Sequence, residues 1–170
     1  MKHFLKVSML ALLFSGTVIA ASPTTGKITV TGKVISGTCD FDGPSDIAVP
    51  LGDVSFNDFG GVGTTTPAQN FTIKLKCQDE ANVYLTMSAT AESSLGSNGV
   101  LALQGSGSAT GVGIQLLKDG NPFSLNSQTQ IALSQTADLT INMGARYYQS
   151  SSSMTAGTGN AVVNFTVDYL

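Results

Sequence analysis

The residue types that carry most enzyme chemistry are scarce in this chain of 170 residues. It has a single histidine, His3, and two cysteines, Cys39 and Cys77. A catalytic triad places a histidine beside its serine or cysteine nucleophile, and two thiolates are too few for a zinc site without histidine. Because His3 lies in a segment that we expect to be cleaved off, the sequence predicts no catalytic residue, no metal site and no cofactor. An enzyme is therefore the least favoured class.

The two cysteines are better suited to a disulfide than to redox catalysis. They lie much farther apart in the sequence than the cysteines of a Cys-X-X-Cys redox pair. An even cysteine count in an exported protein is typical of structural disulfides, with two reactive thiols as the alternative. A Cys39–Cys77 bridge would stabilise the fold by about 4 kcal/mol through the loop that it closes.

Three other segments carry weaker chemical signals. The glycine- and serine-rich stretch 105–111 lacks the Gly-Lys-Ser/Thr ending of a phosphate-binding loop, which favours a hairpin loop. Asp40 and Asp42 precede Gly43 as in a fragment of a calcium loop, but the distal glutamate is missing. Arg146 could anchor a ligand, although a place at a strand edge or a cap is the favoured interpretation.

Residues 1–20 are predicted to be a secretory signal peptide. Lys2 and Lys6 precede the apolar run 9–14, and cleavage is expected after Ala20 or Ala21. The alternative is an uncleaved membrane anchor, which is disfavoured because the apolar run is too short to span a bilayer. Export by this route agrees with the disulfide prediction.

The charge balance narrows the classes of partner. The chain is 42% hydrophobic and only 11% charged, a balance that favours a folded domain over disorder. Without residues 1–20 it keeps six basic and eleven acidic residues, a formal net charge of −5. An acidic chain is a poor ligand for nucleic acid or anionic lipid, so neither is an expected partner.

Alternating apolar and polar residues dominate the rest of the chain. Stretches with this pattern are predicted to be strands, with a further candidate at 47–54 that Pro50 interrupts. The regular stretches are 28–34, 71–77, 83–89, 113–117, 139–148 and 163–169. A turn is predicted at 118–122. The pattern is typical of an antiparallel β-sandwich in one mature domain.

The two ends of the mature chain are unusual for a closed sandwich. At the front, residues 21–27 are polar and an alternating apolar strand begins at Ile28, well before Cys39. At the back, the chain stops inside an alternating strand whose only charged residue is Asp168. Natural proteins usually protect an edge strand with charge or proline, so a closed sandwich does not explain this apolar end.

Five features follow one another along the mature chain. They are the glycine-containing apolar segment 26–34, the cysteine pair, the glycine motif 109–116, the segment 144–148, and Gly157 with Phe165 and Tyr169 near the C-terminus. Together they resemble the subunits of chaperone–usher fimbriae (pili), and the chain is similar to the type 1 pilin group. The resemblance covers essentially the whole mature chain.

The resemblance implies an all-β fold, namely an incomplete immunoglobulin-like β-sandwich that lacks its last strand. It divides the chain into the signal peptide 1–20, an N-terminal donor-strand extension 21–33 and a pilin domain 34–170. A donor strand from another subunit would complete the fold by β-augmentation. The residues implied are Ile28, Val30, Gly32 and Val34 in the donor strand, and Gly157, Val163, Phe165, Val167 and Tyr169 in the C-terminal chaperone- and subunit-binding strand.

The function implied is a structural subunit of a surface fimbria, which polymerises by donor-strand exchange and contributes to cell adhesion. The partners implied are a periplasmic chaperone, an outer-membrane usher and neighbouring pilus subunits, with export through the periplasm to the extracellular fimbrium. The alternative is a minor or tip-proximal fimbrial binding module, for which a host surface ligand is the additional partner.

Overall fold

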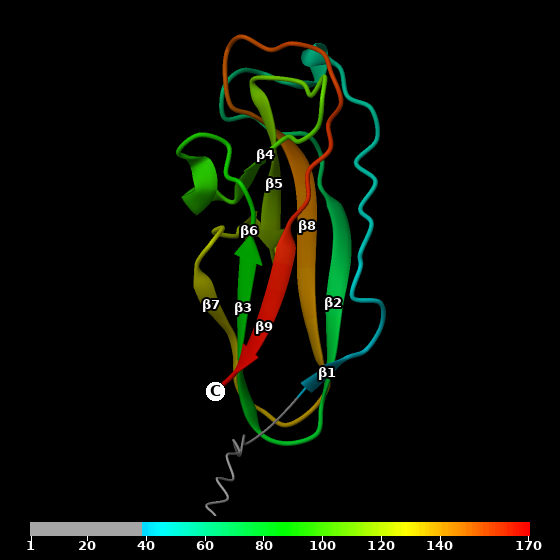
Figure 1. Ribbon diagram of the computed structural model, residues 1–170, viewed down its shortest axis with the longest axis vertical. Coiled ribbons are helices and arrows are strands. Elements are labelled where there is room, and N and C mark those ends of the chain that lie inside the picture. Colours follow the sequence, from blue (N-terminus) through cyan, green and yellow to red (C-terminus); the bar gives the residue numbers. More distant parts are fainter. Residues whose placement is uncertain (1–38) are drawn as a thin grey trace, which may run out of the picture. The chain divides into compact units, whose positions relative to one another are not determined.

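The computed structural model describes residues 39–170, which form two packed β-sheets (Figure 1). The predicted signal peptide and the donor residues Ile28, Val30, Gly32 and Val34 lie outside the described residues. In the part that is described, no helix combines the length and the apolar character needed to cross a membrane.

The larger sheet has six strands, all paired antiparallel. Its order is β1-β2-β8-β5-β4, and the short β6 pairs with the C-terminal end of β5. The strands are β1 (Cys39–Phe41), β2 (Gln69–Cys77), β4 (Val100–Ala102), β5 (Val112–Lys118), β6 (Asn121–Pro122) and β8 (Leu139–Gln149).

The smaller sheet has three antiparallel strands in the order β7-β3-β9. The central strand is β3 (Ala81–Ser88), with β7 (Gln128–Gln135) at one edge and β9 (Asn164–Tyr169) at the other. Two short 3-10 helices, η1 (Phe56–Asp58) and η2 (Leu95–Asn98), lie in the connections. Figure 1 draws β9 in red, ending at the marked C-terminus.

The hydrophobic core lies between the two sheets, because strands with period-two patterning turn alternate side chains inward. The inward side chains of β3 are almost completely buried against those of the larger sheet. The buried aliphatic residues include Ile73, Leu75, Val83, Leu85, Met87, Leu116 and Ile141. Five of the six regular stretches predicted as strands, those after residue 70, are strands within two residues at each end. This part of the sequence prediction is confirmed.

The predicted turn at 118–122 is also confirmed, as the hairpin between β5 and β6. Asp119 and Gly120 have φ angles of 49° and 81°, the positive values that a two-residue type I′ turn requires at both central positions. Lys118 Nζ lies 2.6 Å from the Asp119 carboxylate. That contact lowers the pKa of Asp119, chiefly through the hydrogen bond from Lys118.

Two predictions from the sequence are wrong. Residues 47–54 form no strand, although the side chains of Ile47, Val49 and Leu51 still alternate toward the core. Arg146, expected at an edge or a cap, lies within β8 between β2 and β5, where its Nε donates to Gln115 Oε1 at 2.9 Å. Residues 47–54 alternate as a strand does, but strand pairing, like the place of β8 within the sheet, depends on neighbours that the local sequence does not contain.

Candidate functional site, an apolar groove beside the last strand

The last strand, β9, has one paired edge and one open edge. Its partner is β3, and no other described strand pairs with it. Just beyond its end, Asn82 and Leu170 exchange two backbone hydrogen bonds of 3.2 and 3.1 Å. In an antiparallel ladder such as β3–β9, residue pairs that exchange hydrogen bonds alternate with pairs that do not. Every second residue of β9 therefore points its backbone N–H and C=O away from β3. Those residues are Phe165, Val167 and Tyr169.

The inward side chains of β9 are less buried than those of its neighbour. Phe165, Val167 and Tyr169 of β9, and Val163 just before it, pack against the core but are only partly buried, whereas Val83 and Leu85 of β3 are fully buried. The difference arises because β3 has a strand on each side and β9 has a strand on one side only. The C-terminal strand therefore presents apolar side chains and unpaired backbone groups along the same edge.

A second segment faces this edge and is also unpaired. Residues 44–54, here called the first rim, turn Ile47, Val49 and Leu51 toward the core while Ala48 and Pro50 are exposed. No backbone hydrogen bond joins residues 44–54 to another described residue. In Figure 1 this cyan segment runs beside the larger sheet and is not drawn as an arrow. Residues 155–169, here called the second rim, lie opposite.

A groove separates the two rims. Its lower part has a volume of about 600 Å³ and lies between Ile47 and Phe165, with core residues from both sheets, such as Ile73 and Met87, at its base. Its upper part has a volume of about 880 Å³ and extends past Val54 to η1. The two parts share the lining residues Val49, Leu51, Ile114 and Ala161, so they form one continuous trough. The hydrophobic core is thus accessible along this line.

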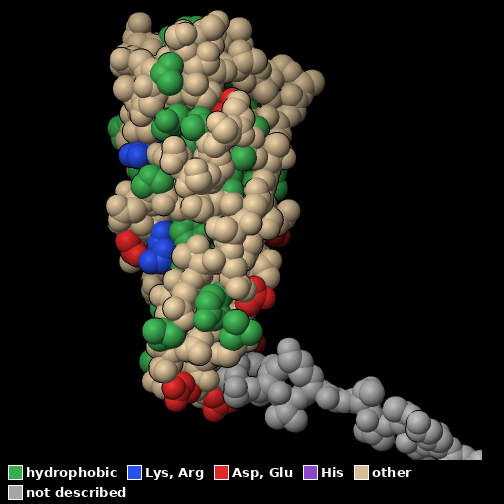
Figure 2. All heavy atoms as spheres, turned by 90° about the vertical axis from the view of Figure 1, so that its left-hand side faces the viewer, with side chains coloured by type: hydrophobic (Ala, Val, Ile, Leu, Met, Phe, Trp, Pro, Cys, Tyr) green, Lys and Arg blue, Asp and Glu red, His purple; other side chains and the backbone are tan. Residues whose placement is uncertain are grey.

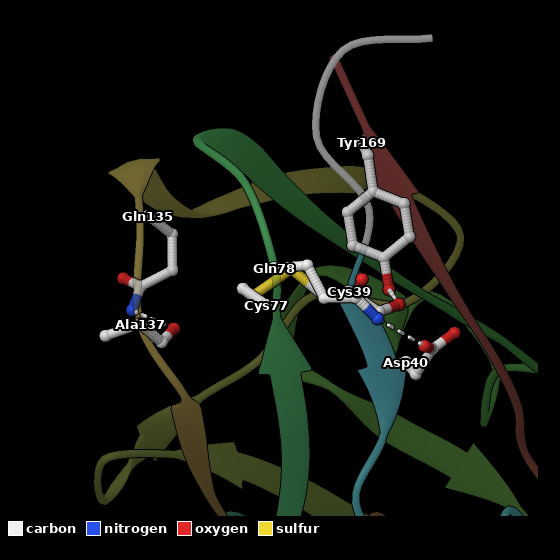
Figure 3. Close-up of a disulfide and its surroundings, with 7 residues drawn as sticks. All are labelled: Cys39, Asp40, Cys77, Gln78, Gln135, Ala137 and Tyr169. Atoms are coloured by element: carbon white, nitrogen blue, oxygen red, sulfur yellow. Dashed lines mark hydrogen bonds between the residues drawn. A yellow bond between two sulfur atoms is a disulfide. The ribbon is translucent and has the colours of Figure 1, made fainter.

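Contacts between β1 and β9 close the lower end of the groove, next to the disulfide. Cys39 and Cys77 are joined by a disulfide between β1 and β2, as the sequence predicts. The Tyr169 hydroxyl donates a hydrogen bond of 2.6 Å to the Cys39 carbonyl (Figure 3). Phe41 and Phe165 stack edge to face with ring centroids 5.4 Å apart. The bridge therefore fixes the strand on which Tyr169 rests.

Tyr147 lies between the rims in the upper part. Its side chain is 8% exposed, and its hydroxyl lies 3.4 Å from both the Gly52 carbonyl and the Gly159 carbonyl. A side chain at Gly159 would overlap the Tyr147 ring, so this position requires glycine. Gly157 is packed in the same way against the backbone of residues 107–109. The glycines of the second rim let it approach β8 and its neighbouring loop closely.

Burial raises the pKa of Tyr147 and of Tyr169. The Asp53 carboxylate raises the pKa of Tyr147 further, and the Asp40 and Asp168 carboxylates do the same for Tyr169. Both hydroxyls therefore stay protonated at neutral pH and act as hydrogen-bond donors to carbonyl groups. Negative charge lies near each end of the groove.

Residues 28–170 match the family model described as fimbrial protein. The chain belongs to the fimbrial protein family. The S-fimbrial protein subunit SfaG of Escherichia coli is 36% identical over 146 residues, covering 84% of this chain and 82% of the relative. The probable major fimbrial subunit LpfA of Escherichia coli O157:H7 is 32% identical, covering 99% of each chain. By contrast, this fimbrial chain spans only 46% of the length of a fimbria adhesin protein of Klebsiella pneumoniae, with 29% identity.

The fold of this fimbrial protein is also similar to that of a solved pilus subunit. The P pilus rod subunit PapA aligns with a TM-score of 0.64 and 20% identity, over 78% of this chain and 99% of that chain. The fold is therefore the expected incomplete immunoglobulin-like sandwich, which lacks its last strand. The protein is a structural fimbrial subunit that is exported to the cell-surface fimbria.

The structure adds groove residues that the sequence prediction missed. Tyr147 and the apolar side chains of the first rim line the groove together with the predicted Gly157, Val163 and Phe165. The alternation at 47–51 was a detectable signal, but it predicted a strand rather than one wall of a groove. No local pattern distinguishes Tyr147 from a core tyrosine, because its role depends on two glycine carbonyls that are remote in sequence.

Proposed function

We propose that this fimbrial subunit polymerises by donor-strand exchange, in which the extension 21–33 of one copy fills the groove of the next copy. The observation that carries the proposal is the apolar trough between β9 and the first rim, with unpaired backbone groups along both walls. A strand laid into it would pair with Phe165, Val167 and Tyr169. An exposed apolar surface of this kind marks a partner site, and addition of a strand satisfies it.

The extension has the composition that the groove requires. Ile28 and Val30 of the extension, together with Val34 directly after it, alternate with polar residues, so one face of an extended strand carries three aliphatic side chains. Each buried aliphatic side chain contributes roughly 1.5–3 kcal/mol and each backbone hydrogen bond roughly 1 kcal/mol. The sum is on the order of 10 kcal/mol before ordering costs. Gly32 suits a point where the donor backbone approaches the groove floor closely.

The geometry of such a contact leads to a filament. The donor segment and the acceptor groove lie on different parts of one chain, so each added copy offers a new groove or a new extension. A heterologous contact of this type that does not close into a ring produces an open polymer. Contribution of the polymer to cell adhesion follows from its display on the cell surface.

The same groove gives a physical reason for the proposed helper proteins. Left empty, it exposes core side chains and strand edges that favour aggregation. In the proposed route, a periplasmic chaperone first lends a strand beside β9, and an outer-membrane usher then presents the subunit to the extension of the next copy. Both steps are β-augmentation of the same edge.

A truncated chain provides the direct test. Residues 34–170, without the extension, are mixed with a peptide of residues 21–33 and the melting temperature is followed. At a peptide concentration of about 100 times Kd, the added stability of about 2.7 kcal/mol raises the melting temperature by roughly 5–10 °C. A peptide with the same residues in scrambled order is the control.

One outcome of this test would contradict the proposal. A truncated chain that is fully stable and indifferent to the peptide would favour a self-complete binding module with a host ligand.

Replacement of Gly32 by leucine in the full chain is expected to impair polymerisation and spare the fold. Normal filaments from that variant, seen by electron microscopy, would show that Gly32 is not in a donor strand.

A further inference from the structure

The charges of the chain are divided unequally between the extension and the folded domain. Residues 39–170 contain all eleven acidic residues but only four basic ones, a formal net charge of −7. Residues 21–38 contain Lys27 and Lys33 and no acidic residue, a formal charge of +2. The segment proposed as donor and the domain proposed as acceptor therefore have opposite charge. Figure 2 shows acidic side chains gathered at the lower end of one face.

The groove itself is acidic at its first rim. The charged residues that line it, within the part of the chain that is described, are Asp46 in the lower part and Asp53 in the upper part. Both are exposed, and neither lies within ion-pair distance of a described cation, since the single described ion pair joins Lys118 and Asp119. The rise in the pKa of Tyr147 from Asp53 agrees with an uncompensated negative potential there.

The spacing of the lysines fits that of the carboxylates. Lys27 and Lys33 are six residues apart, which is about 20 Å in an extended strand. Asp46 and Asp53 are seven residues apart along the first rim, which is at most about 23 Å. Because strand side chains alternate, both lysines would lie on the face opposite Ile28 and Val30 in an inserted strand. They would therefore stay at the solvent surface while the aliphatic side chains fill the groove.

We propose that Asp46 and Asp53 on the groove rim recognise Lys27 and Lys33 of the incoming extension from a second copy, and that this pairing steers subunit addition. The inference rests on the proposed function and names its specificity determinants. With one lysine near each end of the inserted strand and one carboxylate near each end of the rim, both pairs form at once. Complementary charges across an interface mainly increase the association rate and select the correct partner.

The test measures the assembly rate of the mature chain, residues 21–170. Chain with its disulfide intact is diluted from denaturant; folding is followed by tyrosine fluorescence and assembly by light scattering. The variant with Lys27→Gln and Lys33→Gln is expected to fold at the native rate and to assemble about 10-fold more slowly at low salt. At about 1 M salt, where the screening length is about 3 Å, the variant and the native chain are expected to assemble at the same rate.

A matched control removes the same charge elsewhere. Lys74 and Lys76 are exposed on β2, and the variant with Lys74→Gln and Lys76→Gln is expected to assemble within about twofold of the native rate. A charge-swap variant tests the pairing itself. Changing only the two lysines to aspartate, or only the two carboxylates to lysine, should abolish rapid assembly at low salt. The four-site variant, with Lys27→Asp, Lys33→Asp, Asp46→Lys and Asp53→Lys, should restore the native low-salt rate.

Each result is informative about one proposal. Equal low-salt assembly rates for the native chain and the Lys27/Lys33 variant would overturn the charge pairing. An equal loss of assembly rate in the Lys74/Lys76 control would also overturn it. So would a four-site variant that folds but does not recover the native assembly rate. Deletion of residues 21–33 separates the two proposals. Unchanged assembly of the deleted chain would overturn donor-strand exchange, whereas abolished assembly together with charge-independent rates would overturn only the steering.

Discussion

At the scale of single residues, the groove depends on a few close contacts between segments that are separated in sequence. Tyr147 reaches between Gly52 and Gly159, and Tyr169 reaches across to Cys39. Each contact joins segments that are remote in sequence and each uses a hydroxyl donor with a backbone carbonyl acceptor. Gly157 makes a third close contact, because its Cα packs directly against the backbone of residues 107–109. The residues of the C-terminal motif are therefore explained in part by packing within the domain.

Replacement of Gly157 by alanine should destabilise the domain. The added Cβ would overlap the backbone of Gly107 and Ala109, which cannot move as a flexible side chain can. We expect the free energy of unfolding to fall by about 1–3 kcal/mol in a urea titration. Gly60→Ala is the control, because its nearest contact is a methyl group of Thr64 at 3.5 Å. Equal stability of the two variants would contradict the packing role of Gly157.

The two groove tyrosines predict a loss of stability in alkali. Their pKa values are raised in the folded chain, by burial first and by nearby carboxylates second, while an unfolded tyrosine ionises near pH 10. Their contribution is therefore fully present below about pH 10 and is lost as the pH rises through the raised values. The melting temperature should fall above about pH 10, and less steeply in the variant with Tyr147→Phe and Tyr169→Phe. Calorimetry across this range, with tyrosinate absorbance as the titration readout, checks both statements.

At the scale of elements, the regular strands follow from local patterning and the edge strand β7 does not. The sequences of β2, β3, β8 and β9 alternate apolar and polar residues, whereas β7 is rich in glutamine and pairs with β3 through shifts of register. Ser134 within it has a φ of 46°, so the inward and outward positions do not keep period two. A half-exposed strand with a bulge gives no detectable alternation, and the sequence prediction omitted it for that reason.

The strand β9 provides a prediction about one face of an element. Phe165 packs on Phe41 and the core but is only partly buried, whereas Thr166 next to it is exposed. Phe165→Ala should lower the free energy of unfolding by about 1–3 kcal/mol, below the range for a fully buried phenylalanine, and should also weaken the peptide binding described above. Thr166→Ala should change either quantity by less than about 0.5 kcal/mol. Equal effects from both variants would show that β9 does not present one face to the groove.

At the scale of the whole molecule, the fold is complete except along one line. Two sheets share a core, a disulfide ties the first strand to the second, and the open line runs between the last strand and the first rim. The two walls come from opposite ends of the domain sequence, so the groove exists only once the sandwich has formed. The proposed assembly contact would therefore use a surface that only folding creates.

Hydrogen exchange should report the open edge directly. In the mature chain before assembly, the amides of Phe165, Val167 and Tyr169 should exchange faster than those of Thr166 and Asp168, which bond to β3. In filaments all five should become protected, because an added strand would pair with the open edge. The measurement is residue-resolved deuterium uptake in both states. Unchanged exchange of the three open-edge amides on assembly would place the subunit contact elsewhere.

The sequence by itself determined the positions of the five regular strands after residue 70, the sandwich class, the cysteine pair and the resemblance to fimbrial subunits, because alternation and short motifs are local properties. Only the tertiary structure decided that residues 47–54 are a rim rather than a strand and that Arg146 lies in an inner strand. It also brought Asp46, Asp53 and Tyr147 into the same groove. A chain segment becomes a strand or a wall according to whether a neighbour supplies hydrogen bonds, and that neighbour comes from a distant part of the chain or from another molecule.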